Sequence, residues 1–156
     1  MRFNKKIILG VLAAALLLGA TPAFAQLLGT WEGTGLGNCY PYPGVAIYPW
    51  SVWKGEVYQS PDEDVILFEG EWYDELGNKG IFKGKILPFA TPGKRYFKGK
   101  WFWYDPTGVS AEPVYGGDFE MTFYLEVTDP PYCKGEWKTH WPSMTAVGTM
   151  KGKKVD

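Results

Sequence analysis

The side chains that most often carry catalysis or hold metals are few in this sequence. Its 156 residues include one histidine, His140, and two cysteines, Cys39 and Cys133. Because a zinc or iron–sulfur centre draws on several such ligands, we expect no metal site and no cofactor. His140 precedes Trp141, and none of the nearby serines and threonines lies in a nucleophile-elbow pattern. We therefore interpret His140 as structural rather than catalytic.

The carboxylates predict no catalytic pair either. Asp62-Glu63-Asp64 lacks the spaced ligands and the glycine of a calcium loop, and it fits a solvated turn. Glycoside hydrolysis uses two carboxylates that face one another, but only Asp74 falls in an inward register of the strands inferred below. The near balance of 16 basic and 17 acidic residues excludes a polybasic nucleic-acid binder. An enzyme that uses His140 or Asp74 is the third of three hypotheses.

Residues 1–25 have the organisation of a secretory signal peptide. A basic start that ends in Lys5-Lys6 is followed by an apolar run over residues 7–18. Ala23-Phe24-Ala25 supplies the small residues of a cleavage site, so we expect cleavage between Ala25 and Gln26. The run is shorter than the ~20 residues of a membrane-spanning helix. We predict a secreted or periplasmic domain of residues 26–156 that does not insert into a membrane.

This compartment bears on the charge and on the two cysteines. Cleavage removes Arg2, Lys5 and Lys6, so the mature chain keeps 13 bases against 17 acids and has a net charge of −4. Outside the cytoplasm, an even pair of cysteines normally forms a disulfide. We therefore predict a bond between Cys39 and Cys133.

A five-residue unit centred on glycine recurs eight times along the mature chain. A large apolar residue and usually a charge precede the glycine, and usually a charge or threonine and then a second large residue follow it. The central glycines are Gly33, Gly55, Gly70, Gly84, Gly99, Gly117, Gly135 and Gly152. Successive glycines lie 14 to 22 residues apart, which leaves room for a strand and a turn. Since the alternation has a period of two, each copy predicts a strand with glycine and rings on one face and charges on the other.

Eight sequential strands with short connections form an antiparallel meander. Turn signals occupy the gaps, as in Thr91-Pro92-Gly93. Rolling the sheet into a barrel buries its apolar face and removes both free edges. Outward positions carry charges such as Lys98 and Lys100, where a membrane barrel has an apolar belt. The predicted fold is all-β, a single soluble eight-stranded antiparallel up-and-down barrel with glycines on its crowded inner face.

Gly29-Thr30-Trp31, which opens the first predicted strand, resembles the G-x-W signature of calycin-type barrels, the lipocalins, avidins and their relatives. The resemblance implies that Trp31 plugs the closed end and that a basic residue late in the last strand packs across it. Lys153 and Lys154 are the candidates, with Lys154 in the better register. The chain shows neither the C-terminal helix of lipocalins nor a recognisable biotin-site pattern. Phe68-Glu69-Gly70-Glu71-Trp72 also resembles the core of a MORN repeat, but MORN repeats keep a fixed period.

The longest predicted connections lie together at the end opposite Trp31. Connections of an up-and-down barrel alternate between its two ends, and this end receives residues 36–49, 74–78, 105–113 and 140–143. A pocket there would have an aromatic rim formed by Tyr40, Tyr42, Tyr48, Trp50, Trp103, His140 and Trp141. Aromatic rims suit apolar ligands, sugar faces and cationic ligands.

Two functions without catalysis follow from this arrangement. The leading hypothesis is a barrel that binds a small apolar or sugar-like ligand at its aromatic mouth. The alternative is a barrel with a packed interior whose loop rich in proline and tyrosine contacts a partner protein or a surface, as a secreted inhibitor would. The sequence leaves open whether the interior is empty or filled.

Overall fold

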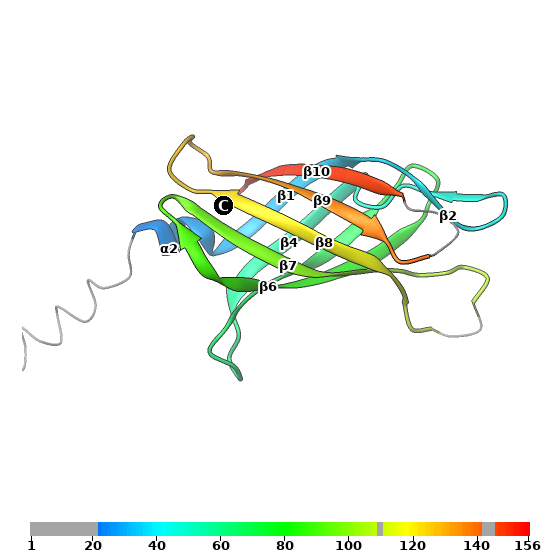
Figure 1. Ribbon diagram of the computed structural model, residues 1–156, viewed down its shortest axis with the longest axis horizontal. Coiled ribbons are helices and arrows are strands. Elements are labelled where there is room, and N and C mark those ends of the chain that lie inside the picture. The colour runs from blue at the N-terminus through cyan, green and yellow to red at the C-terminus, as the bar shows by residue number, and fades with distance from the viewer. Residues whose placement is uncertain (1–21, 109–110, 142–145) are drawn as a thin grey trace, which may run out of the picture.

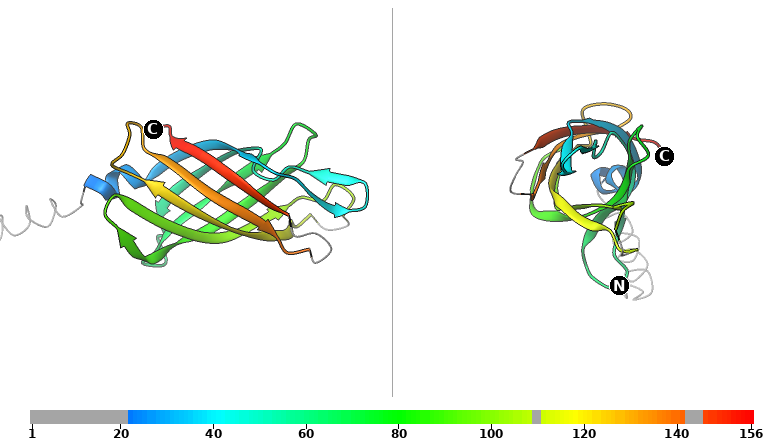
Figure 2. Two further views of the ribbon diagram at one scale, coloured as in Figure 1. Left: turned by 45° about the horizontal axis from the view of Figure 1, so that its top comes forward. Right: turned by 90° about the vertical axis from the view of Figure 1, so that its right-hand side faces the viewer.

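The chain forms a closed barrel of eight antiparallel strands, seen from the side in Figure 1 and down its axis in Figure 2. The computed structural model describes residues 22–108, 111–141 and 146–156; the expected signal residues 1–21 and part of the predicted turn at 140–143 lie outside these ranges. The barrel strands are β1 (Gly29–Leu36), β4 (Val52–Gln59), β5 (Ile66–Tyr73), β6 (Lys79–Thr91), β7 (Lys94–Trp103), β8 (Val114–Tyr124), β9 (Tyr132–Thr139) and β10 (Val147–Lys154). Each pairs with the next along the chain, and β1 closes the barrel by pairing with both β4 and β10. The predicted fold is confirmed.

Two small elements stand at opposite ends of this barrel. A hairpin of β2 (Cys39–Tyr42) and β3 (Val45–Ile47) extends beyond one end, which we call the mouth. A short helix, α2 (Pro22–Leu27), lies at the other end, which we call the closed end. Viewed from the mouth, α2 falls within the outline of the barrel (Figure 2). No helix in the described ranges has both the length and the apolar character needed to cross a membrane.

Each copy of the glycine-centred unit lies in one barrel strand, and several of the glycines face one another across strands. Gly33 pairs with Gly152, and Gly55 pairs with Gly70. A Cβ on Gly33 would lie 1.9 Å from a main-chain oxygen and 2.7 Å from the ring of Trp53. Real Cβ atoms essentially never approach non-bonded atoms within 3.0 Å, so only glycine lets the strand and the ring lie this close together. The predicted place of glycine on the inner face is confirmed.

Aromatic rings fill the interior of the barrel from one end to the other. Trp31 meets Phe123 at 4.6 Å between ring centroids, and Phe123 meets Phe68 at 5.2 Å. Phe68 meets Phe82 at 4.9 Å, and Phe82 stacks on Trp50 at 4.2 Å. All five side chains are buried. These contacts form a continuous column of rings, so this part of the barrel is packed rather than open.

Trp31 lies at the closed end beside α2. Its indole Nε1 donates a hydrogen bond to the main-chain oxygen of Leu27 (3.0 Å), and both side chains are fully buried. Lys154 pairs with Trp31 across β1 and β10, and its Nζ donates to the main-chain oxygen of Ala25 (3.1 Å). Trp31 and its basic neighbour therefore occupy the end that the G-x-W resemblance implies. The expected cleavage before Gln26 would fall within α2 and leave Leu27 in place.

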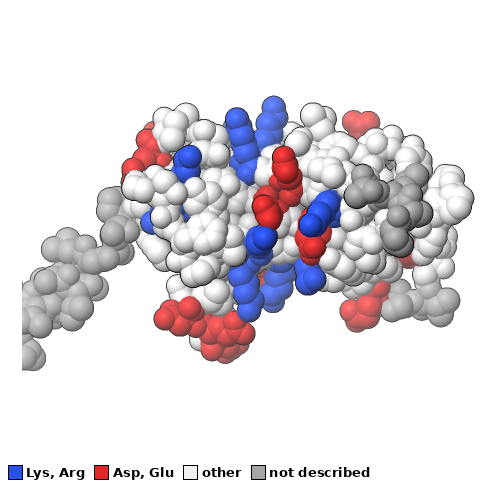
Figure 3. All heavy atoms as spheres, viewed as in Figure 1, with Lys and Arg blue, Asp and Glu red and all other residues white. Residues whose placement is uncertain are grey.

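Charged side chains form a band across the middle of the outer face (Figure 3). They flank the glycines of the repeated unit, and ion pairs such as Lys83–Glu69 (2.7 Å) and Lys98–Glu120 (2.9 Å) join neighbouring strands. Exposed pairs of this kind contribute at most about 1 kcal/mol each, because water competes for both partners. The band therefore gives the barrel a polar exterior but supplies little of its stability.

The predicted disulfide between Cys39 and Cys133 is wrong. Both thiols are buried and unpaired. Cys39 starts the hairpin at the mouth, opposite Ile47, whereas Cys133 follows a closed-end connection and pairs with Phe123. The two cysteines thus lie near opposite ends of the barrel. Burial raises the pKa of Cys39 to about 12 and also raises the pKa of Cys133, so both remain thiols at neutral pH.

Candidate functional site at the barrel mouth

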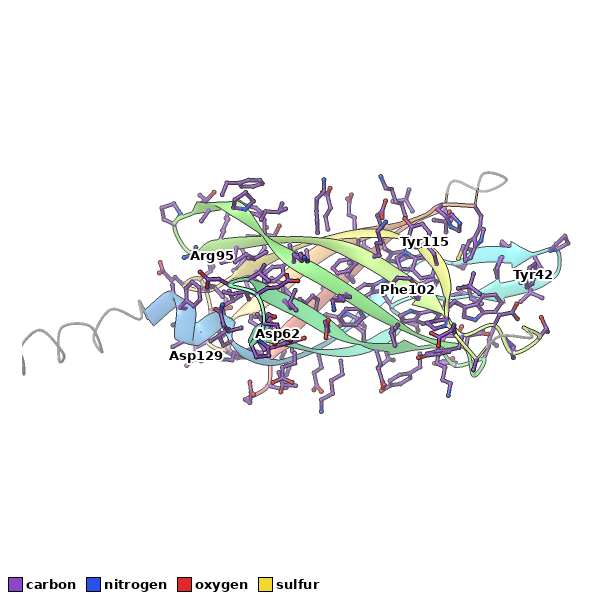
Figure 4. The ribbon with its side chains drawn as sticks, turned by 90° about the horizontal axis from the view of Figure 1, so that it is seen from below. Tyr42, Asp62, Arg95, Phe102, Tyr115 and Asp129 are labelled. Atoms are coloured by element: carbon purple, nitrogen blue, oxygen red, sulfur yellow. The ribbon has the colours of Figure 1, made fainter. Side chains whose placement is uncertain are left out.

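The β2–β3 hairpin presents aromatic rings to solvent at the mouth. Tyr40, Tyr42 and Tyr48 keep 40%, 44% and 41% of their surface exposed, although large rings are usually more buried. Figure 4 shows Tyr42 near the tip of the hairpin, at the end of the molecule opposite Asp129. Gly44 takes a φ of +80° in the turn between the two strands, a conformation that glycine adopts without strain. Tyr40 and Tyr42 therefore lie on the hairpin, and Tyr48 directly follows it, so this segment of the mouth exposes three rings.

Tyr42 is fixed against the barrel by two contacts. Its hydroxyl donates a short hydrogen bond to Oδ2 of Asp105, and its ring lies 5.9 Å from the ring of Trp103. The hydrogen bond raises the pKa of Tyr42 and lowers the pKa of Asp105. Two of the predicted rim residues, Tyr42 and Trp103, are thus in direct contact, but Trp103 is buried whereas Tyr42 is exposed.

Asp74 ties the hairpin segment to the turn between β5 and β6. Its carboxylate, only 8% exposed, accepts hydrogen bonds from the main-chain nitrogens of Tyr48 (3.0 Å), Leu76 (2.9 Å) and Asn78 (2.9 Å). The side-chain amide of Asn78 donates a fourth (2.8 Å). Four donors saturate this carboxylate, so its evident role is to brace the chain before Trp50.

His140 and Trp141 lie on another side of the mouth. The main-chain nitrogen of His140 donates to the oxygen of Gly116 (3.0 Å), and its ring lies 4.5 Å from that of Tyr115. Trp141 is half-buried, with its ring at right angles to Trp101. Within the described ranges, no hydrogen bond joins His140 to Asp74, and no three histidine, cysteine or acidic side chains are grouped to hold a metal ion. The two residues of the enzyme hypothesis, His140 and Asp74, are thus not joined in one site.

Trp50 lies inside the barrel rather than at an exposed rim. It is fully buried, and its φ of +62° places it in the left-handed region, which costs a residue with a Cβ about 1–2 kcal/mol. Its ring stacks on Phe82 and meets Phe119 edge-on at 4.9 Å. Strained backbone conformations are concentrated at functional sites, so the strain at Trp50 makes the connection between β3 and β4 a candidate functional segment.

The indole N–H groups of the interior fall into two sets. Four of them donate to main-chain oxygens at 3.0–3.3 Å; these belong to Trp31, Trp53, Trp72 and Trp101. Those of Trp50, Trp103 and Trp137 are buried and have no hydrogen-bond acceptor in the part of the chain that the structure describes. Leaving such a donor unpaired costs about 1–3 kcal/mol, so native proteins rarely do so without a reason.

The sequence predicts an aromatic rim at the mouth but not the packing of the rings inside the barrel. For Phe82, Phe119 and Trp137 the sequence predicts only a place in the core, because each is an inward residue of the repeated unit. Their inward register was the signal that was available. What the register does not reveal is that the ring of Trp50 enters the barrel and packs against two of them, Phe82 and Phe119.

No protein-family model matches this chain, and no curated protein matches it in sequence. The barrel topology and the geometry of the mouth are therefore the grounds for a functional proposal.

Proposed function

We propose that the protein is a non-catalytic binding protein that takes a small apolar or sugar-like ligand at its aromatic mouth. The observation that carries the proposal is the exposure of three rings at the mouth, Tyr40 and Tyr42 on the hairpin and Tyr48 directly after it. Their exposure leaves apolar surface available, and the Asp74 and Asp105 contacts hold their segments in place. A ligand would thus meet a preorganised aromatic surface.

The resemblance to calycin-type barrels adds support without carrying the proposal. The eight-stranded up-and-down order and the position of Trp31 at the closed end agree with it. Calycin-type barrels bind ligands at the open end, which corresponds to the mouth in this chain. Secretion into the periplasm or the medium, after cleavage behind Ala25, belongs to the same proposal.

Nuclear magnetic resonance titration of the folded protein with two probes tests this function. N-phenyl-1-naphthylamine represents apolar ligands and chitotriose represents sugar faces. Binding of either probe is expected to move the resonances of the hairpin and to weaken about tenfold in a Tyr40→Ala/Tyr48→Ala variant, which corresponds to about 1.4 kcal/mol. Tyr73→Ala is the matched control, because Tyr73 is a half-exposed ring on β5 outside the hairpin. Failure of both probes to move the hairpin resonances would refute the proposal.

The filled interior favours a second candidate, a packed barrel whose hairpin contacts a partner protein. Because the column of rings from Trp31 to Trp50 fills the interior, such a molecule would bind its partner through its outer surface. Crosslinking from a photoreactive residue at position 40 separates the candidates. A specific protein adduct that is lost when Tyr42 and Tyr48 are replaced by alanine would support the partner protein, and its absence would oppose it.

A further inference from the structure

The mouth is closed by Trp50, a residue that belongs to no strand. It lies between β3 and β4, and its ring contacts Trp53 of β4 (5.9 Å), Phe82 of β6 (4.2 Å) and Phe119 of β8 (4.9 Å). In the order of strands around the wall, β4 and β8 lie on opposite sides. The ring therefore occupies the centre of the barrel at this height, where a ligand would sit in an open barrel.

Polar contacts hold Trp50 only loosely. Its indole N–H is one of the unpaired donors, and its backbone is in the left-handed region. The next residue, Ser51, donates to Tyr48 at 3.2 Å and accepts from Gly35 at 3.3 Å, both at or beyond the long end of the usual range. Stacking in the interior is therefore the main force that keeps this ring in place.

The surroundings of Trp50 would suit another flat ring. Phe82 offers a stacking face, with planes inclined by only 23°, and Trp53 and Phe119 offer edges. Trp137 pairs with Phe119 across β8 and β9, so a residue with an unpaired buried N–H neighbours one of the rings that Trp50 contacts. Trp103 contributes a second unpaired N–H in the same half of the barrel. The rings of Trp53, Phe82 and Phe119 offer no opposite charge to an ionic ligand, so burying such a ligand among them would be costly.

We propose that Trp50 is a built-in occupant of an internal binding site for a flat, uncharged aromatic molecule with a hydrogen-bond acceptor at its edge. The ligand stacks on Phe82 in place of the indole and accepts a hydrogen bond from Trp137 or Trp103. Trp50 moves outward toward the tyrosines of the hairpin, which relieves its backbone. This inference rests on the proposed function and names the class of ligand.

Trp50→Gly provides the test, because glycine accepts a positive φ and leaves a space of the shape of an indole. The probes are quinoline and naphthalene, which have the same shape but differ in the ring nitrogen that accepts a hydrogen bond. If the open form is about 1% of the wild-type population, Trp50→Gly should bind quinoline about 100-fold more tightly than wild type. Quinoline, but not naphthalene, should shift the indole N–H resonance of Trp137 or Trp103 downfield. Trp141→Gly, which removes a half-buried ring of the same end, should not gain affinity.

Equal affinity for quinoline in Trp50→Gly and wild type would overturn the proposal. Identical indole shifts with both probes would also overturn it, since the unpaired donors would then have no part in binding. If Trp50→Gly does not fold, wild type is titrated with quinoline to its solubility limit. The indole resonance of Trp50 should move to the position of a solvent-exposed ring while that of Trp31 stays fixed; an unmoved Trp50 signal would contradict the inference.

These results separate the inference from the function on which it rests. If the hairpin tyrosines bind N-phenyl-1-naphthylamine or chitotriose while Trp50→Gly gains no affinity for quinoline, only the internal site fails. If Trp50→Gly gains affinity but neither probe moves the hairpin, the internal site stands and binding at the tyrosine rim is refuted.

Discussion

A tryptophan closes each end of this barrel, but the two residues are held in opposite ways. Trp31 lies in β1, donates its N–H to Leu27 and meets Phe123 edge-on at an interplanar angle of 88°. Trp50 lies between strands, leaves its N–H unpaired and has a positive φ. Both rings are fully buried. Burial alone therefore does not distinguish Trp31, which is held in place, from Trp50, which we propose a ligand can replace. The indole hydrogen bond and the backbone conformation do distinguish them.

The largest expected effect compares these two residues directly. Trp31→Ala should lower the free energy of unfolding by about 4 kcal/mol, since loss of a large buried ring costs roughly 3–5 kcal/mol. Trp50→Gly should cost about 2 kcal/mol, because the variant also removes a strained backbone and an unpaired donor. Urea denaturation followed by circular dichroism measures both values. Equal costs would mean that the two ends are closed in the same way.

A smaller effect is expected at the carboxylate that braces the mouth. Asp74→Asn should lower the free energy of unfolding by about 2 kcal/mol, because an amide nitrogen replaces an acceptor among four donors. Amide hydrogen exchange should accelerate at Tyr48 and Trp50 but not at Trp31. Asp105→Asn is the control: Oδ2 of this carboxylate accepts from Tyr42 of the hairpin, Oδ1 accepts from Thr107 in its own turn, and the substitution should cost less than about 0.5 kcal/mol. Exchange that accelerates equally at both ends would remove the distinction between them.

The two unpaired cysteines report on the two ends separately. Under non-reducing conditions both should react with iodoacetamide after denaturation, since no disulfide joins them. In the native protein, Cys39 on the small mouth hairpin should be alkylated about ten times faster than Cys133 in the barrel wall, a difference of about 1.4 kcal/mol in opening free energy. Peptide mass spectrometry at timed intervals measures both rates. Faster reaction at Cys133 would show that the closed end opens first.

The smallest effect should arise in the charged band, away from both ends. Partial burial raises the pKa of Glu69, but hydrogen bonds from Lys83 and Tyr58 outweigh it and hold the pKa below its usual value. Its contribution to stability is therefore present above the unfolded-state pKa of about 4.3 and is lost as the pH falls through the folded-state pKa. Glu69→Gln should remove this part of the pH dependence in denaturation curves between pH 7 and pH 3. An unchanged pH profile in the variant would assign the acid sensitivity to other carboxylates.

The strands and the closure of the barrel could be predicted because they follow from a local pattern. Alternation of period two determines which residues face inward, and the turn signals between the glycine-centred units indicate where strands end. Pairs such as Gly33 with Gly152 then fall into register once the first and last strands meet. The ring of Trp31 at the closed end was predictable from the G-x-W resemblance for the same reason, since its position depends only on the order of strands.

What the sequence did not predict depends on contacts between distant parts of the chain. The disulfide prediction used the compartment and the number of cysteines, and it gave too little weight to Cys133 following a closed-end connection. The entry of Trp50 into the interior requires a positive φ that no local propensity favours, and its packing against Trp53, Phe82 and Phe119 accounts for it. The contact of Tyr42 with Asp105 joins residues 63 positions apart, a distance at which sequence patterns carry no signal. The roles of the other rim residues stay predictions.

The paired glycines of the inner face also fix the register of the seam, which is the pairing of β1 with β10. A slip of two residues would keep every side chain on its proper face, so the alternation of polar and apolar residues alone would not reject it. At the seam, however, such a slip would place a residue with a Cβ opposite Gly33, where the ring of Trp53 leaves no room. The error is therefore rejected by shape. The narrow space at Gly33 would accept β10 of a second molecule only in the native register. Any exchange of strands between two molecules would therefore form the same β1–β10 pairing.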